Sequence, residues 1–364
     1  MQKKLILENG QEFIGEGFGS NENKICEVVF NTSMAGYQEI ISDPSYTYQA
    51  VVMTYPLIGN YGTNDEDYES KQPTVSGLIV REYNDFPSNF RSNRTLDEVM
   101  KEFNISGISG IDTRKLARII RDFGTCKGLI TDASVTLEEG MKILNTENVK
   151  TDAVSKVSCK RIWESKRTAD STITEKNYFK VVAIDCGMKL NIVRSLNAAG
   201  CDVIIVPYNT PADRIIEFEP DGIFVSNGPG DPTDVPEVID TLRMLIRKYP
   251  IFGICLGHQL ISLAYGAKTY KLKFGHRGGN HPVKNLLTDK VEITSQNHSY
   301  AVDVESIKNT PLKITHMNLL DNTVEGIKSE KDKVFSVQYH PESAPGPEDS
   351  KYLFKDFLMM MEDK

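Results

Sequence analysis

The chain has 364 residues, of which 40% are hydrophobic and 25% charged, and its formal net charge is −8. This composition is typical of a globular protein. The length predicts two domains, because one core rarely grows beyond about 250–300 residues. The acidic balance argues against a dedicated nucleic-acid binder, and the sequence contains no apolar run long enough to predict a membrane span.

The first 150 residues are expected to form a β-rich α/β domain. Residues 5–7 and 12–15 flank an Asn9-Gly10 turn and predict a hairpin. Further strands are expected at 26–30 and 50–54. Residues 112–123 predict a helix that Asp112 or Thr113 caps and Gly124 ends.

Residues 151–177 are polar, lack periodicity and are predicted to be a linker. Residues 178–364 then form the second domain, in which short apolar strands alternate with helices. Strands are expected at 179–184, 202–206, 222–226 and 251–254, helices at 190–199, 212–218, 235–248 and 256–265, and mixed β structure at 268–340. This rhythm predicts an α/β fold with a mostly parallel sheet covered on both faces. Binding sites in such sheets lie outside the carboxyl ends of the strands.

The six cysteines, at positions 26, 126, 159, 186, 201 and 255, form no C-x-x-C pair. A disulfide framework or a metal site is therefore not expected, and reduced thiols fit a cytoplasmic protein. His276 and His281 lie in a glycine-rich stretch without a neighbouring acidic or cysteine ligand, so no metal is predicted there.

Cys255 stands at the centre of the most informative segment, Gly253-Ile254-Cys255-Leu256-Gly257. A buried strand, a tight turn and a helix predict a nucleophile elbow with cysteine in place of serine. The flanking glycines allow neighbouring backbone to approach the turn. The positive end of the following helix favours the thiolate form of the sulfur.

A cysteine nucleophile needs a base, and His340 is the best candidate among six histidines. Glu342 lies two residues further on, where it can orient the imidazole. The loop Asn227-Gly228-Pro229-Gly230 also follows a strand, so its backbone N–H groups can stabilise an oxyanion at the same sheet edge.

Three segments resemble the motifs of the class I (triad) glutamine amidotransferases: Ser226-Asn227-Gly228-Pro229-Gly230-Asp231-Pro232, Gly253-Ile254-Cys255-Leu256-Gly257-His258-Gln259 and His340-Pro341-Glu342. Further segments are similar to the small subunit of carbamoyl-phosphate synthase, among them residues 31–39, 43–46, 55–62, 110–114, 278–282 and 295–298. The resemblance covers essentially the whole chain.

The resemblance implies that Cys255 attacks glutamine and forms a thioester, that His340 transfers protons and that Glu342 orients His340. It implies an oxyanion hole from the backbone N–H groups of Gly230 and Leu256. Expected glutamine contacts carry over to Ser45, Gly228, Gln259 and Asn297. Ser299 and Tyr300 follow Asn-His where the family usually has Gly-Phe, which changes the side chains beside the substrate.

The resemblance also implies a large partner subunit that uses ATP and Mg²⁺ to make carbamoyl phosphate for arginine and pyrimidine synthesis. We expect no cofactor in this chain, no nucleic-acid partner and no membrane partner. Three alternatives remain open: another class I amidotransferase subunit such as that of anthranilate synthase, a stand-alone γ-glutamyl cysteine hydrolase, and a catalytically idle regulatory subunit.

Overall fold

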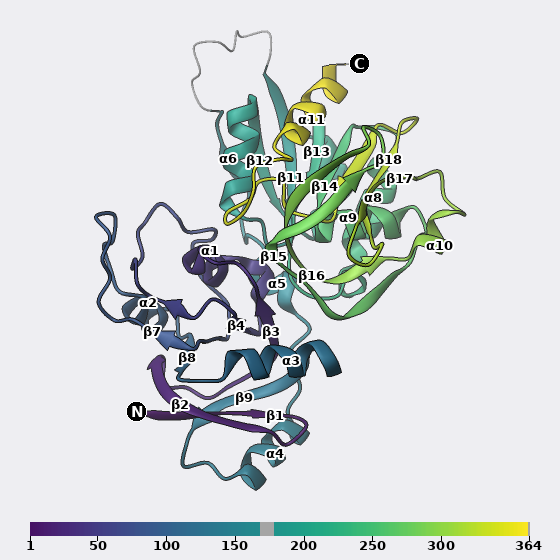
Figure 1. The fold of residues 1–364 in the computed structure, drawn as a ribbon. Helices are drawn as coiled ribbons and strands as arrows, with labels where there is room; N and C mark the ends of the chain where they lie inside the picture. The colour runs from purple at the N-terminus through teal and green to yellow at the C-terminus, as the bar shows by residue number, and fades with distance from the viewer. Residues whose placement is uncertain (168–177, 363–364) are drawn as a thin grey trace. The chain divides into compact units, whose positions relative to one another are not determined.

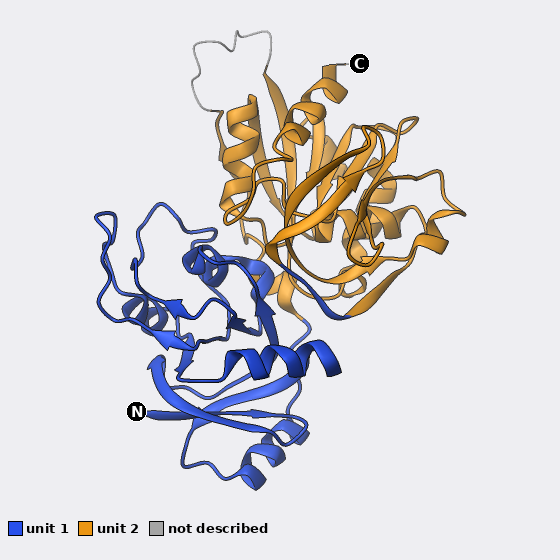
Figure 2. Ribbon diagram, viewed as in Figure 1, with its two compact units in different colours: residues 1–151, 273–277 blue, residues 152–272, 278–364 orange. Residues whose placement is uncertain are grey.

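The computed structural model describes residues 1–167 and 178–362. The chain divides into two compact units, and each is described by itself. Unit 1 comprises residues 1–151 and 273–277, and unit 2 comprises residues 152–272 and 278–364 (Figure 2). Within the described residues, no helix has the length and apolar character needed to cross a membrane.

Unit 1 is built on a closed β-barrel (Figure 1). The barrel order is β1 (Gln2–Leu7), β2 (Glu12–Gly19), β8 (Ser106–Ser109), β6 (Gly77–Ile79), β4 (Gln49–Met53), β3 (Lys24–Asn31) and β9 (Cys126–Asp132). The predicted hairpin of β1 and β2 is confirmed, with Leu5 opposite Phe13. Pairing of β9 with β1 closes the barrel.

Short helices surround the barrel: α1 (Tyr37–Ser42), η1 (Pro44–Tyr46), α2 (Leu96–Glu102), α3 (Thr113–Phe123) and α4 (Leu137–Thr146). The predicted helix corresponds to α3. The Asp112 carboxylate accepts a hydrogen bond from the backbone N–H of Lys115 at 2.9 Å and caps this helix. Leu116 and Ile120 bury its apolar face against the barrel.

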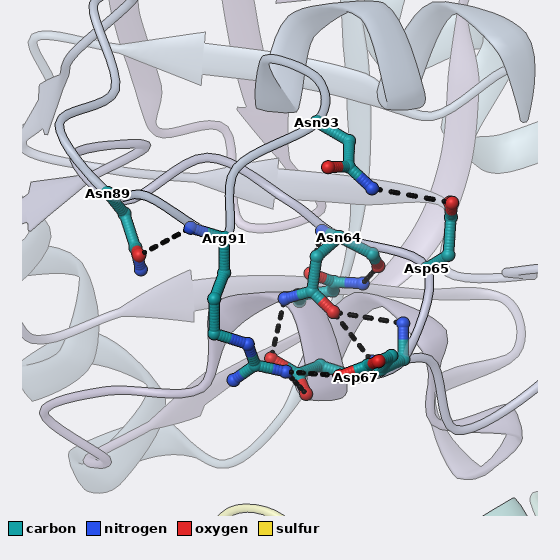
Figure 3. Close-up of polar contacts among 8 residues, drawn as sticks. Asn64, Asp65, Asp67, Asn89, Arg91 and Asn93 are labelled. Atoms are coloured by element: carbon teal, nitrogen blue, oxygen red, sulfur yellow. Dashed lines mark hydrogen bonds and ion pairs between the residues drawn. The ribbon is translucent and has the colours of Figure 1, made fainter.

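Two loops of unit 1 are joined by polar contacts next to the small sheet of β5 (Leu57–Ile58) and β7 (Glu82–Tyr83). The Arg91 guanidinium donates to Glu66 at 3.1 Å and to Asp67 at 2.8 Å, and Figure 3 shows its contact with Asp67. The Asn93 amide donates to Asp65 at 3.3 Å. These pairs are solvent-exposed, so each contributes little stability, but together they define the path of both loops.

Residues 273–277 belong to unit 1 although they lie far along the chain. They are the middle part of the long strand β15 (Thr269–Asn285). The backbone N–H of Thr125 donates to the Lys273 carbonyl at 2.9 Å, and the Thr32 hydroxyl donates to the Arg277 carbonyl at 3.2 Å. The Phe274 ring stacks on Phe30 with centroids 5.9 Å apart. The sequence gives no local sign of this return.

Unit 2 contains a sheet of ten strands. Its centre is parallel, as predicted, in the order β12 (Cys201–Pro207), β11 (Phe179–Asp185), β13 (Gly222–Val225), β14 (Ile251–Ile254) and β19 (Val334–Val337). Beyond β19 the sheet continues through antiparallel β18 (Val324–Ser329) and β17 (Lys313–Asn318), and then through β15 and β16 (Lys290–Val302).

Helices cover both faces of the parallel strands (Figure 1). One apolar core includes α7 (Ala212–Ile216), α8 (Pro236–Leu245) and α9 (Leu256–Ala264), and the other includes α6 (Leu190–Ala199) and α11 (Tyr352–Glu362). The short η3 (Pro232–Asp234) and α10 (Val304–Ile307) complete the unit. All four residues of β14 are buried, which explains its continuous apolar sequence.

The structure differs from the sequence prediction in the segment 151–177. Unit 2 already begins at Asp152 and contains α5 (Ala153–Val157) and β10 (Trp163–Ser165) from this segment. Trp163 of β10 lies opposite Ile205 of β12, so β10 is an antiparallel edge strand of the sheet. Elements of five and three residues are too short to show periodicity. The rest of the predicted linker, 168–177, lies outside the described residues.

Candidate active site

Cys255 occupies a strained turn between β14 and α9. Its φ of 54° and ψ of −104° are rare for a residue with a side chain. A Cβ on Gly257 would lie 2.2 Å from the Val225 carbonyl oxygen, and one on Gly253 would lie 2.5 Å from Ile261 Cδ1. Both positions therefore require glycine, and the turn has the form of the predicted elbow.

Backbone hydrogen bonds hold the elbow in place. The N–H of Cys255 donates to the Val337 carbonyl at 2.9 Å, and the N–H of Gly257 donates to the Ser226 carbonyl at 3.0 Å. The N–H of Leu256 is at the first position of α9, where a helix provides no internal partner. The Cys255 side chain is 2% exposed, and its sulfur lies 3.6 Å from the Asn297 carbonyl oxygen.

His340 and Glu342 form a buried pair. His340 Nδ1 lies 2.7 Å from Glu342 Oε1. Burial alone would lower the pKa of His340, but the negative charges of Glu342 and of the Cys255 thiolate outweigh this effect and raise the pKa to about 10. The Cys255 side chain is close enough to His340 to contribute to this shift through both its charge and a side-chain hydrogen bond.

Lys189 is a further member of this cluster, which the sequence analysis did not identify. Its ammonium lies 3.0 Å from Glu342 Oε1 and donates to the Ser343 carbonyl at 2.6 Å. Burial would raise the pKa of Glu342, but Lys189 and His340 hold it near 2. The carboxylate therefore stays ionised between two cations.

A short loop after β11 positions Lys189. The Asp185 carboxylate accepts from the N–H groups of Gly187 and Met188 at 2.9 and 2.8 Å. The next N–H, that of Lys189, donates to the Asn227 side chain at 3.1 Å. The side chain of Asn227 therefore links the predicted oxyanion loop to the lysine.

The glycines of the oxyanion loop meet different requirements. A Cβ on Gly228 would lie 2.2 Å from the Cys186 carbonyl oxygen, so the close approach of the two backbone segments leaves no room for a side chain here. Gly230 has φ of 89°, which a residue with a side chain rarely adopts. This bend is where the predicted oxyanion donor, the N–H of Gly230, is located.

The residues expected to bind glutamine are distributed over both units. Gln259 of α9 donates to the Tyr300 carbonyl at 2.9 Å and to the Gln338 side chain at 3.0 Å. Asn297, Ser299 and Tyr300 lie on β16 in unit 2. Ser45 lies in η1 of unit 1, where its N–H donates to Asp43 at 2.9 Å. Their contacts with glutamine stay predictions.

His258 has a structural position, as expected for a residue inside the helix after the elbow. Its Nδ1 lies 2.9 Å from the Ser336 hydroxyl, and the side chain is fully buried. Burial lowers its pKa to about 3, with a further contribution from His316, so it is neutral near pH 7.

Comparisons with known proteins agree across the whole chain. Residues 182–360 match the family model described as glutamine amidotransferase class-I, and residues 5–130 match the carbamoyl-phosphate synthase small chain, CPSase domain. The carbamoyl phosphate synthase small chain of Bacillus cereus is 55% identical over 363 residues, which cover 100% of this chain and 97% of the relative.

Two other relatives give the same result. The carbamoyl phosphate synthase small chain of Fusobacterium nucleatum is 51% identical and covers 98% of this chain and 97% of its own length. The carbamoyl phosphate synthase pyrimidine-specific small chain of Bacillus subtilis is 52% identical and covers 100% of this chain and 96% of its own length. The chain belongs to the carbamoyl-phosphate synthase small-chain family and carries that family's class I glutamine amidotransferase domain.

Proposed function

We propose that Cys255, His340 and Glu342 carry out the glutamine hydrolysis that characterises a carbamoyl-phosphate synthase small chain. The observation that carries this assignment is the buried His340–Glu342 pair, at 2.7 Å, acting on the sulfur of an elbow cysteine. The raised pKa of His340 means that its resting side chain is an imidazolium, which holds the proton for the leaving group beside the nucleophilic sulfur of Cys255.

In the first half of the reaction, the Cys255 thiolate attacks the side-chain amide carbon of glutamine. The resulting oxyanion is stabilised by the backbone N–H groups of Leu256 and Gly230. His340 gives its proton to the amide nitrogen, the C–N bond breaks and ammonia leaves. A γ-glutamyl thioester on Cys255 remains.

In the second half, neutral His340 removes a proton from water as the water attacks the thioester. The C–S bond breaks, glutamate leaves and the thiolate–imidazolium pair is restored. Glu342 keeps Nδ1 of His340 protonated throughout, so Nε2 is the atom that exchanges protons. Lys189 keeps Glu342 ionised.

Glutamine recognition is assigned to the residues that match the family motif: Ser45, Gly228, Gln259, Asn297, Ser299 and Tyr300. The position of the Asn297 carbonyl 3.6 Å from the Cys255 sulfur supports this choice, because it places β16 next to the reacting atoms. The side-chain amide of Gln259 already bonds Tyr300 and Gln338, which favours a role for Gln259 in shaping the pocket wall.

The released ammonia passes to a large subunit that uses ATP and Mg²⁺ to make carbamoyl phosphate from bicarbonate. The names of the relatives support this division, since each is a small chain of carbamoyl phosphate synthase. We assign the product to pyrimidine or arginine synthesis in the cytoplasm. The pyrimidine-specific small chain of Bacillus subtilis is one relative with a stated pathway.

The test compares glutamine-dependent and ammonia-dependent synthesis by the complex. Cys255→Ser is expected to abolish the first and preserve the second, because a serine hydroxyl is not ionised at this position. His340→Asn should lose several orders of magnitude in kcat with glutamine, and Glu342→Gln should lose less. Glutamine hydrolysis by Cys255→Ser at the wild-type rate would refute the assignment.

A further inference from the structure

A closed set of hydrogen bonds lies in unit 2 and includes residues of β16, the strand whose Asn297 carbonyl is next to the Cys255 sulfur. We call it the polar circuit, and its members are Glu325, Gln296, His298, Tyr300, Gln259 and Gln338. It joins β16, β18, α9 and the segment that leads to His340. None of its members belongs to the Cys255–His340–Glu342 trio.

Glu325 of β18 is the acceptor from which the circuit starts. Its side chain is fully buried. Oε2 accepts from the Gln296 amide at 3.0 Å, and Oε1 accepts from the Asn318 amide at 2.9 Å. A buried carboxylate is costly unless its oxygens receive such donors.

The bond from Gln296 to Glu325 sets the direction of the next bond. The Gln296 amide nitrogen donates to Glu325 Oε2, so its carbonyl oxygen faces His298 Nε2 at 2.9 Å. His298 Nδ1 lies 2.7 Å from the Tyr300 carbonyl oxygen. The His298 ring therefore lies between two acceptor atoms, Gln296 Oε1 and the Tyr300 carbonyl oxygen.

The remaining bonds return to Glu325. The Tyr300 carbonyl also accepts from the Gln259 amide at 2.9 Å, and this amide donates to the Gln338 side chain at 3.0 Å. The backbone N–H of Gln338 donates to the Glu325 carbonyl at 2.9 Å. The circuit thus fixes the backbone on both sides of Asn297 and the chain just before His340.

We propose that Glu325 is a positioning residue for glutamine binding. It orients Gln296, which holds His298 between two acceptors and so keeps residues 297–300 in the shape that receives the substrate. The Gln296 amide connects Glu325 to His298 through two hydrogen bonds. The inference rests on the proposed function, since it concerns the pocket of the same enzyme.

The experiment measures KM for glutamine and kcat for glutamine-dependent synthesis in the complex with the large chain. Glu325→Ala removes an acceptor from two buried amides and should raise KM about tenfold or more, with kcat within about twofold of wild type. Glu325→Gln keeps an acceptor for Gln296 and should partly restore KM. Gln296→Met cuts the connection to His298 while leaving the Glu325–Asn318 bond, and should raise KM like the alanine variant.

Glu292 provides the matched control. Like Glu325 it is a buried carboxylate, 7% exposed, but it lies on β16. It accepts hydrogen bonds from the Tyr352 and Ser350 hydroxyls at 2.8 and 2.7 Å, and neither of these residues belongs to the polar circuit. Glu292→Gln should leave KM unchanged even where it lowers the melting temperature.

Wild-type KM in a folded Glu325→Ala or Gln296→Met variant would overturn the proposal, as would a loss of kcat at constant KM. Both results leave the proposed function intact, because that function is refuted by glutamine hydrolysis in Cys255→Ser at the wild-type rate, which these variants do not test. Should the alanine variant not fold, the Gln296→Met result decides.

Discussion

The Lys189 ammonium lies 3.0 Å from the Glu342 carboxylate, and both side chains are almost completely buried. The carboxylate that orients His340 therefore has two positive neighbours and stays ionised. A buried carboxylate with one weak partner would instead take up a proton and lose its hold on the imidazolium.

Lys189→Met is expected to impair glutamine hydrolysis while leaving ammonia-dependent synthesis intact. Removing one partner of a buried ion pair costs about 3–5 kcal/mol, and protonation of Glu342 would relieve part of that cost. We expect a fall in kcat with glutamine of about tenfold or more. Lys351→Met is the control, because its pair with Glu348 is at the surface. Equal kcat values in the two variants would contradict the role of Lys189.

Thiol chemistry should single out Cys255 among the six cysteines. Burial raises the pKa of Cys201 to about 12, and burial together with nearby carboxylates does the same for Cys126 and Cys159. A glutamine-analogue electrophile at pH 7 should therefore modify one site, read by intact mass and peptide mapping. Cys201→Ala should label like wild type. Equal labelling of Cys255→Ala would show that the reactive thiol lies elsewhere.

His258 should make unit 2 sensitive to acid. Its pKa is lowered to about 3 in the folded state, against 6.5 for the ordinary side chain, so the unfolded chain binds the proton more readily. Its contribution to stability is therefore complete above pH 6.5 and is lost as the pH falls towards 3. Between pH 7.5 and 5 this loss amounts to about 2 kcal/mol.

Urea unfolding of wild type and His258→Gln at both pH values tests this. Trp163, the single tryptophan, lies on β10 and reports on unit 2 by fluorescence. The variant should be less stable at pH 7.5 but should lose less stability on acidification. Burial likewise lowers the pKa of His316, to about 4, so His316→Gln should respond in the same way. Identical pH dependence in wild type and in both variants would rule out this explanation.

The isolated chain is expected to be a poor glutaminase that the large chain activates. Unchecked hydrolysis would release ammonia without a consumer, so the aligned triad should be favoured by complex formation. Steady-state glutamine hydrolysis, with and without the large chain and ATP, measures the effect. Equal rates together with no complex on gel filtration would favour a free-standing hydrolase.

Local patterns were sufficient to predict the elbow and much of unit 2. Gly253 and Gly257 mark the tight turn, and α9 follows directly, so neighbouring residues specify this geometry. Glu342 is two residues from His340, which is why their contact was accessible to sequence reasoning. The alternation of strands and helices likewise predicted the parallel sheet.

Long-range pairings were not predictable in the same way. The position of Lys189 depends on the Asp185 turn and on Asn227, and its partner Glu342 lies on a distant segment. No local pattern distinguishes it from a surface lysine. The barrel of unit 1 is closed by β1 and β9, which are separated by most of that unit's sequence, so the strands were recognisable but their closure was not.

The return of residues 273–277 to unit 1 has a consequence for dissecting this protein genetically. A single cut after residue 151 would give one fragment lacking the strand that carries Phe274 and another fragment carrying that strand without its ring partner Phe30. The first piece is therefore an incomplete unit 1, and the second piece carries all of unit 2 together with a strand segment that belongs to unit 1. The two halves of the chain are therefore expected to have been inherited together, and fusions or swaps between relatives should exchange residues 273–277 along with the first 151.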